Sequence, residues 1–528
     1  MSKAMAMLLS LFLLAPATTW AADQADLMKK IEELSQQLQQ LKQQMGELQK
    51  KETVKEERIG NVEKKTAAVE KKTEESAGGW PAWFEIGGDF RTRFDYMSGT
   101  SADFFTPNPV NPFGLPPVLV PSEKFKNEAL LTNRLGLNMK FKATEDIQVK
   151  TRLLMYKVWG HETGGPVSGA NSFFADKQSI FDGNVAHTPS DNALRVDQAY
   201  ATWSNIADQP IWFSVGRRPS TGGVPTNLRL NNQKTGSAGV PGLLIDYAFD
   251  GATFGVAPDI DALPGFYAKL CYGKGFDSGF RSSANSMKDV NFLGFNVVPY
   301  ETDNFRVEVQ YSRGFDIFAF PEFSAMTFPG FGTLSNTNLG DIDQFGAVVS
   351  GKIDNLGPGN LNLFMSSAMS KTHPNSNIIG FPGMLEYGLM WDNVAGRNSR
   401  TGYALYAGAR YDIPSTGTKI GVEYNHGSKN WITFTPASDD MWTSKLGTRG
   451  SVYEIYAIQE LLKKPVSKLG KAFFRVGYQY YDFDYTGSNN WVGAPVKITD
   501  LTTTMYAPQM FQPLKKAQNI YATFDVQF

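Results

Sequence analysis

The chain has 528 residues, of which 42% are hydrophobic and 20% are charged, so it could form several soluble domains or one large β structure. Its 51 basic and 52 acidic residues nearly cancel, which leaves no overall field to attract nucleic acid or an anionic membrane surface, and no nucleic-acid partner is expected. The 50 glycines, 37 phenylalanines and 21 tyrosines favour strands and turns over helices.

Residues 1–21 have the pattern of a cleavable signal peptide. Lys3 precedes an apolar stretch from Ala4 to Ala15, and Thr19-Trp20-Ala21 ends on a small residue suited to cleavage. We therefore expect the mature chain to begin at Ala22. The alternative is an N-terminal membrane anchor, which the short apolar stretch disfavours.

Residues 22–77 predict a periplasmic coiled coil. Apolar residues recur at alternating steps of four and three, while Lys, Glu and Gln fill the other positions. The first half of this stripe is Leu27, Ile31, Leu34, Leu38, Leu41, Met45 and Leu48, and Ile59, Val62, Thr66, Val69 and Thr73 continue it in the same phase. A free helix would leave its leucines in water, so self-association is expected, as a homotrimer. A lone, solvated spacer helix is the alternative.

The period changes to two in residues 78–528. Apolar and polar residues alternate over 84–96, 134–142 and 305–312, so that one face of each strand suits lipid and the other suits water. After residue 21 the sequence contains no run of about 18 apolar residues, the length that a membrane-spanning helix needs. In lipid, only a closed barrel satisfies the backbone hydrogen bonds of strands. We therefore predict an all-β fold, a transmembrane antiparallel β-barrel of about 16 strands, within a range of roughly 14 to 18, embedded in outer-membrane lipid.

The connections alternate between short and long, as in outer-membrane barrels, whose periplasmic turns are short. The short ones are expected near 143–146, 205–210, 257–264, 299–303, 354–359, 412–417 and 463–470. Long, polar segments separate them, and this parity places both ends of the barrel on the periplasmic side. Residues 243–256 are ambiguous, because they could form one long strand or a hairpin turning at Asp250-Gly251.

The last strand carries an assembly signal. Ile520, Ala522, Phe524, Val526 and Phe528 alternate with polar residues, and the chain ends on an aromatic side chain. This pattern resembles the terminal strand that the barrel assembly machinery recognises, and it assigns that role to Phe528.

Taken together, the signal peptide, coiled coil, barrel and terminal Phe resemble the coiled-coil-bearing porins, including the phosphate-selective type, in architecture only. In sequence, the segments 212–219 (WFSVGRRP) and 230–234 (LNNQK) more closely resemble an uncharacterised family of outer-membrane barrel proteins of metal-reducing deltaproteobacteria. The resemblance implies a place in the cell outer membrane, with the coiled coil in the periplasm, but it implies no solute. No ladder of lumenal basic residues matches the phosphate porins, so their selectivity is not expected.

Three classes of function fit these features. The first is a porin-like channel for passive diffusion of small hydrophilic solutes, favoured because charged residues facing inward need water. The second, raised by the family resemblance, is the sheath of a porin-cytochrome electron conduit with a multihaem cytochrome partner. The third is a surface-loop enzyme or adhesin.

The sequence predicts neither a cofactor nor an enzyme. Cys271 is the single cysteine, which excludes an intrachain disulfide and a Cys-x-x-Cys-His haem attachment. The histidines His161, His187, His373 and His426 fall in or beside predicted outer loops, without a spacing that would fix a metal or a catalytic base.

Strand parity assigns the inward charges. The expected pore-lining residues are Arg91, Arg93, Arg134, Lys140, Lys150, Arg152, Arg195, Lys269, Arg306, Glu308, Arg410, Glu423 and Arg475. Lys142, Lys352 and Lys419 join the basic set, and Glu85, Asp89, Asp95, Asp197 and Asp525 join the acidic set. Because basic residues lead, a wide, water-filled lumen should weakly prefer anions. The alternative is that these charges pair across neighbouring strands, and whether outer loops fold inward is left open.

Overall fold

The computed structural model describes residues 81–528 apart from 109, 111–113, 161–188, 190, 221, 233–242, 284, 319–326, 329–331, 334–336, 436–438, 463–469, 504–508 and 510–511. The expected signal peptide and coiled coil therefore lie outside the described residues. Residues Trp83–Phe528 form one compact unit. Among the described residues, no helix is long and apolar enough to cross a membrane.

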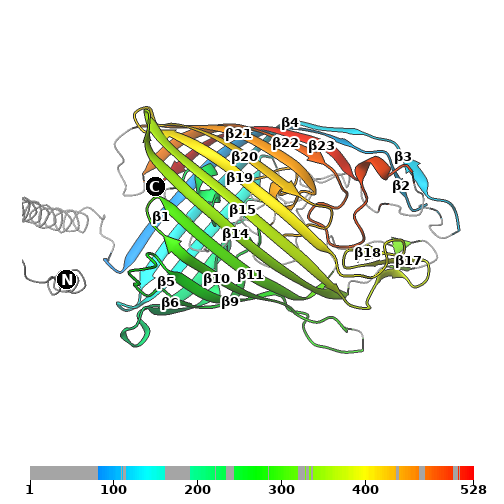
Figure 1. The fold of residues 1–528 in the computed structure, drawn as a ribbon, viewed down its shortest axis with the longest axis horizontal. Coiled ribbons are helices and arrows are strands. Elements are labelled where there is room, and N and C mark those ends of the chain that lie inside the picture. Colours follow the sequence, from blue (N-terminus) through cyan, green and yellow to red (C-terminus); the bar gives the residue numbers. More distant parts are fainter. Residues whose placement is uncertain are drawn as a thin grey trace, which may run out of the picture. The chain divides into compact units, whose positions relative to one another are not determined.

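Sixteen antiparallel strands close into a barrel, which confirms the predicted fold class and strand number (Figure 1). In chain order the barrel strands are β1 (Phe84–Ser101), β4 (Lys124–Lys142), β5 (Ile147–Val158), β6 (Arg195–Trp203), β7 (Ile211–Arg217), β8 (Asp250–Val256), β9 (Tyr267–Phe276), β10 (Val290–Glu301), β11 (Phe305–Phe318), β14 (Asn338–Leu356), β15 (Gly359–Pro374), β19 (Thr401–Ile413), β20 (Thr418–Gly427), β21 (Gly450–Glu460), β22 (Lys471–Phe483) and β23 (Leu514–Gln527). Each pairs with its sequence neighbour in the wall, and β1 closes the ring against β23.

The connections alternate as the sequence predicted. Short turns such as 143–146, 302–304 and 414–417 lie at one end, and long segments such as 218–249 and 428–449 leave from the other. Some long connections carry small sheets, formed by β2 (Phe104–Thr106) with β3 (Val118–Val120), β12 (Thr327–Phe328) with β13 (Gly332–Thr333), and β16 (Ile379–Phe381), β17 (Leu385–Gly388) and β18 (Trp391–Asp392). Short helical elements are η1 (Ile206–Asp208), α2 (Thr226–Arg229), η2 (Lys445–Gly447) and η3 (Ile498–Asp500).

The barrel wall is apolar outside and polar inside. On β21, Tyr453 and Ile455 are about half exposed (51% and 52%), whereas Glu454 between them is buried. Arg475 on β22 is likewise buried between the exposed Phe474 and Val476. A soluble sheet that packs on a core buries its apolar face, so this reversed arrangement is typical of a strand wall in contact with lipid.

The terminal strand is fixed where the barrel closes. The Phe528 N–H donates to the Gly88 carbonyl (3.0 Å), and the Gly88 N–H donates to the Phe528 carbonyl (2.8 Å). A Cβ at Gly88 would lie 2.7 Å from the Phe528 ring and 2.5 Å from the Gly136 carbonyl oxygen. Glycine at this position therefore leaves the space in which the terminal ring packs.

The ambiguous segment 243–256 is neither one strand nor a hairpin. Strand β8 contains only its second half, Asp250–Val256. Leu243, Leu244 and Phe249 are buried and belong to an apolar cluster inside the barrel, because the connection between β7 and β8 folds inward.

Candidate functional site: the barrel interior

Two long connections place described residues inside the barrel, in contact with its wall. The inner segment, by which we mean the described residues of 218–249, follows β7 and includes helix α2, which lies near the opposite wall, where the Arg410 guanidinium on β19 donates to the Leu228 carbonyl. The latch segment 428–449 connects β20 and β21 and lies against β1, β4, β20, β21 and β22. The interior is therefore built from loop residues as well as wall residues.

Asp439 of the latch segment is surrounded by arginines of the wall. The Arg91 guanidinium binds it through two hydrogen bonds of 2.5 Å each, and both side chains are buried. Arg134 and Arg475 add nitrogens 3.7 Å and 3.6 Å from its carboxylate. Burial raises the pKa of Asp439, but the charges of Arg91 and Arg134 outweigh it and hold this pKa well below its ordinary value. Asp439 is therefore ionised and ties the latch to three strands.

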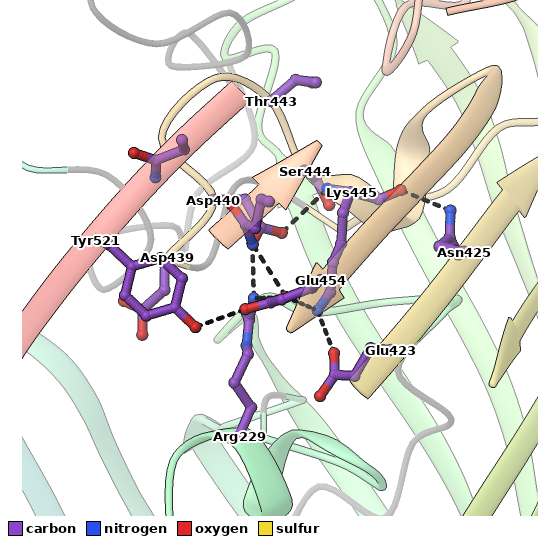
Figure 2. Close-up of polar contacts among 12 residues, drawn as sticks. Arg229, Glu423, Asn425, Asp439, Asp440, Thr443, Ser444, Lys445, Glu454 and Tyr521 are labelled. Atoms are coloured by element: carbon purple, nitrogen blue, oxygen red, sulfur yellow. Dashed lines mark hydrogen bonds and ion pairs between the residues drawn. The ribbon is translucent and has the colours of Figure 1, made fainter. Parts of the chain in front are cut away.

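Lys445 makes the complementary contact with acidic wall residues (Figure 2). Its ammonium donates to Glu423 on β20 and to Glu454 on β21, the latter at 2.5 Å. Burial and the nearby charge of Arg229 lower the pKa of Lys445, but the two carboxylates outweigh both and raise it overall. The Tyr521 hydroxyl of β23 donates to Glu454 at 2.7 Å.

Arg229 at the end of α2 joins the two inward segments. Its guanidinium donates to Asp440 of the latch segment at 2.7 Å and to Glu454 of the wall at 3.2 Å (Figure 2). The Arg229 carbonyl in turn accepts a hydrogen bond of 2.8 Å from Arg475. The inner segment, the latch segment and the wall thus share one buried ion-pair network.

The tip of the inner segment reaches the short-turn end of the barrel. Asn231 has a φ of 57°, a left-handed conformation that asparagine tolerates, and it turns the chain directly after α2. Its amide donates to Glu460 at 2.9 Å, and its side-chain oxygen accepts from Lys419 at 2.7 Å. Lys471 donates to its carbonyl at 2.7 Å. These partners lie where β20, β21 and β22 meet their short turns.

An apolar cluster packs between the inward segments. Phe434 of the latch segment contacts Phe292 of β10 and Trp491 edge-to-face, with ring centroids 5.0 Å and 5.6 Å apart. The backbones of the two segments also pair, because the Phe434 N–H donates to the Leu244 carbonyl at 2.9 Å. Burying each large apolar side chain contributes roughly 1.5–3 kcal/mol, so this cluster stabilises the inward position of both segments.

A cavity of about 1100 Å³ lies at the short-turn end, on the side formed by β8–β15. We call it the vestibule. The tip of the inner segment forms one wall through Val224, Pro225 and Leu228, and turn residues such as Asp259 and Asp303 form the rim. Arg306 and Lys352 add positive charge, so the lining is polar and carries both signs.

The predicted pore-lining residues divide into groups. Arg91, Arg93, Lys269, Glu308, Arg410, Glu423 and Arg475 are buried in the interior, and Arg134, Arg152 and Arg306 keep 14–17% of their side chains exposed. Lys140 is 30% exposed and pairs with Glu85 (3.2 Å), and Lys150 is partly buried. Arg195 stands apart at the long-loop end and pairs with Asp191 at 2.5 Å.

Arg91 and Arg93 are buried, whereas the sequence predicted that they face a wide, water-filled lumen. Arg93 donates to Asp95 on its own strand (2.6 Å), and Arg152 pairs across strands with Asp89 (2.7 Å), while Arg91 is neutralised by the latch segment. The prediction from strand parity considered only charged residues of the barrel wall. It therefore missed Asp439, Asp440 and Lys445, which predicted outer loops bring inside.

The described histidines serve as hydrogen-bond partners. His373 Nε2 lies 2.7 Å from Asp343, and His426 Nδ1 lies 3.1 Å from the Ser451 hydroxyl. His161 and His187 lie outside the described residues. Within the described part of the chain, no group of three or more His, Cys, Asp or Glu residues could hold a metal ion.

Among solved structures, the chain is similar to several bacterial barrels. In-vitro folded OmpT of Vibrio cholerae, in its trimer form, shares 11% identity over 84% of this chain and 99% of its own, with a TM-score of 0.38. An anion-selective porin from Comamonas acidovorans shares 10% over 84% and 99% (TM-score 0.38), and OmpF of Salmonella typhi in complex with daunomycin shares 11% over 84% and 97% (TM-score 0.40). Likeness at this level carries no argument about function.

No curated protein matches the chain. A family model described as "Protein of unknown function (DUF3373)" matches residues 124–528, which contain every barrel strand except β1. This match agrees with the resemblance to an uncharacterised family that the sequence indicated. The chain belongs to the DUF3373 family.

Proposed function

We propose that this protein is a porin-like channel of the outer membrane, through which small hydrophilic solutes diffuse along a path narrowed by its own inner and latch segments. The observation that carries the proposal is the barrel wall, which is apolar outside and polar inside and encloses a vestibule of about 1100 Å³. The vestibule is lined in part by charged side chains such as Lys352 (40% exposed), which are stable there because water reaches them. Such an interior favours solute passage.

The outer surface supports a place in the outer membrane. Aromatic side chains cluster on the outer face near the short turns, for example Phe84 beside Phe141 and Phe474 beside Phe524, as at a lipid interface. By the usual orientation of such barrels, the short turns would face the periplasm, and the predicted coiled coil would lie there.

The occupied interior disfavours the alternative of a sheath around a cytochrome. A haem protein inside this barrel would have to displace the network that Arg229, Asp439 and Lys445 form with the wall. We therefore favour a diffusion channel over the sheath of an electron conduit as the function of this barrel.

The loop charges also weaken the proposed anion preference. Asp439 neutralises wall arginines that a count of the wall leaves unpaired, so a preference for anions must arise where a solute meets unneutralised cations. We propose that this occurs on the β8–β11 side, next to the vestibule.

Liposome swelling tests the channel. Liposomes that contain the heat-modifiable, folded protein should swell in the smallest uncharged sugars and progressively less in trisaccharides and tetrasaccharides, because the path is narrow. Protein-free liposomes and liposomes with heat-denatured protein are the controls. Swelling no faster than these controls in a pentose solution would refute the channel.

A further inference from the structure

A second, smaller cavity lies between the inner segment and the wall. Its volume is about 40 Å³, which is room for roughly three waters or one small oxyanion. Ser220, Ile245 and Phe249 of the inner segment cover it. Strands β8–β11 supply the other side through Thr253, Lys269, Cys271, Asn296 and Gln310, and Arg218 completes the lining.

The cavity holds two cations that carboxylates of the lining do not neutralise. Lys269 is only 4% exposed, and Arg218 donates to the Thr253 hydroxyl while its buried Nε has no hydrogen-bond partner. Among the described residues that line the cavity, none is acidic. Glu308 lies nearby on β11, but its oxygens already accept hydrogen bonds from Asn296 (2.8 Å) and Arg306 (3.0 Å).

Two acceptors of the cavity are also unsatisfied. The Asn296 and Gln310 side chains are buried, and the carbonyl oxygen of each lacks a hydrogen-bond donor. Buried polar groups are normally paired, so these atoms point to a ligand that supplies hydrogens. A ligand that satisfies both the cations and these acceptors is an anion that also carries a proton or hydroxyl group.

The cavity adjoins the proposed solute path. Tyr267 and Arg306 line the vestibule, and Lys269 and Gln310 line the small cavity further along the same strands, β9 and β11. A solute that moves inward from the vestibule along this wall would meet Lys269 first.

We propose that the Arg218–Lys269 cavity is a binding subsite for one small, protonated oxyanion, located at the inner end of the vestibule. The inference rests on the proposed channel, because the path delivers the ion. Arg218 and Lys269 attract the charge, Thr253 and Ser220 offer hydroxyls, and Asn296 and Gln310 accept the hydrogen of the ligand.

The single cysteine provides the test, because Cys271 lines the cavity. In the full-length protein, the negatively charged sulfonatoethyl methanethiosulfonate should modify Cys271 faster than the similarly sized trimethylammonium reagent. Inorganic phosphate should slow the reaction saturably at neutral pH. Sulfate, which has no proton to donate, should protect less, and chloride least.

Variants separate the site from general charge effects. Lys269→Gln, and independently Arg218→Gln, should raise the phosphate concentration for half-protection by about tenfold or more, because each removes a charged hydrogen-bond donor. Lys140→Gln removes a wall charge that does not line the cavity and should change nothing. Heat-modifiable mobility shows which variants are folded.

Unchanged protection in both folded cavity variants, or no saturable protection of the wild type, would overturn the proposal. If neither reagent reaches Cys271, equilibrium dialysis with labelled phosphate decides it in the same way: wild-type binding that Lys269→Gln weakens supports the site, and equal or absent binding refutes it. Solute swelling is measured separately. Swelling without phosphate binding would remove the subsite and keep the channel, whereas binding without swelling would do the reverse.

Discussion

Replacing Asp439 with Asn should release the latch segment from the barrel wall. The carboxylate holds Arg91 through two bonds of 2.5 Å and has Arg134 and Arg475 within 3.7 Å, and Arg91 and Arg475 are almost fully buried. Removing one partner of a buried ion pair costs about 3–5 kcal/mol, because the remaining charges stay desolvated. Since Asn can still accept a hydrogen bond, we take the lower value. About 3 kcal/mol shifts the equilibrium between docked and released latch by roughly a hundredfold.

Single-channel recording in planar bilayers measures this shift. The Asp439→Asn channel should show larger conductance steps or a higher open probability than the wild type, because the arginines gain water when the latch leaves. Asp484→Asn removes the same charge from an exposed loop position and should behave as the wild type. An unchanged conductance in folded Asp439→Asn would refute the idea that this ion-pair cluster closes the interior.

Three further predictions follow from other parts of the chain. Burial raises the pKa of Asp246 on the inner segment to about 7 from an ordinary 3.8, against the opposing effects of the Gly222 N–H and Arg229. Docking of the inner segment inside the barrel is therefore favoured in acid and is lost as the pH rises through 7. The open probability of the channel should increase from pH 5 to pH 8, and Asp246→Asn should remove most of that change. Deleting Phe528 should lower the yield of the protein in the outer membrane without blocking export. Gly88→Val should act similarly, because its side chain would fill the space of the Phe528 ring. Normal yield of both variants would contradict the role of the terminal strand as an assembly signal. Residues 25–75 should self-associate, so cross-linking of the full-length protein should give trimers, whereas a monomer together with an unassociated isolated segment would remove that prediction.

The sequence predicts the wall well because the wall obeys a period of two. Leu135, Leu137 and Met139 alternate with polar residues, lipid contact selects that pattern, and strand number and turn positions follow from counting it. The interior is harder to predict because loop residues reach it through contacts distant in sequence, such as Arg91 with Asp439. A polar loop with a net acidic tip is equally suited to solvent and to a basic wall.

Some signals in the loops could have been used. Trp431-Ile432-Thr433-Phe434 is an apolar run inside a predicted outer loop, where water would surround it, and Leu243-Leu244-Ile245 is a second apolar run, at the start of the segment expected to be a strand or a hairpin. Such runs need a partner surface, and in the structure they are partners of each other. The segment 230–234, singled out only by family resemblance, begins with the turn that anchors the inner segment near the short turns.

We propose a channel that its own segments restrict, and removing one of these segments tests the proposal. The measurement compares the unitary conductance of the wild type with that of a variant in which residues 429–447 are replaced by a short Gly-Ser linker. We expect small but measurable steps for the wild type and clearly larger steps for the variant. Folded barrels of both proteins that conduct no ions, or that conduct equally, would contradict it.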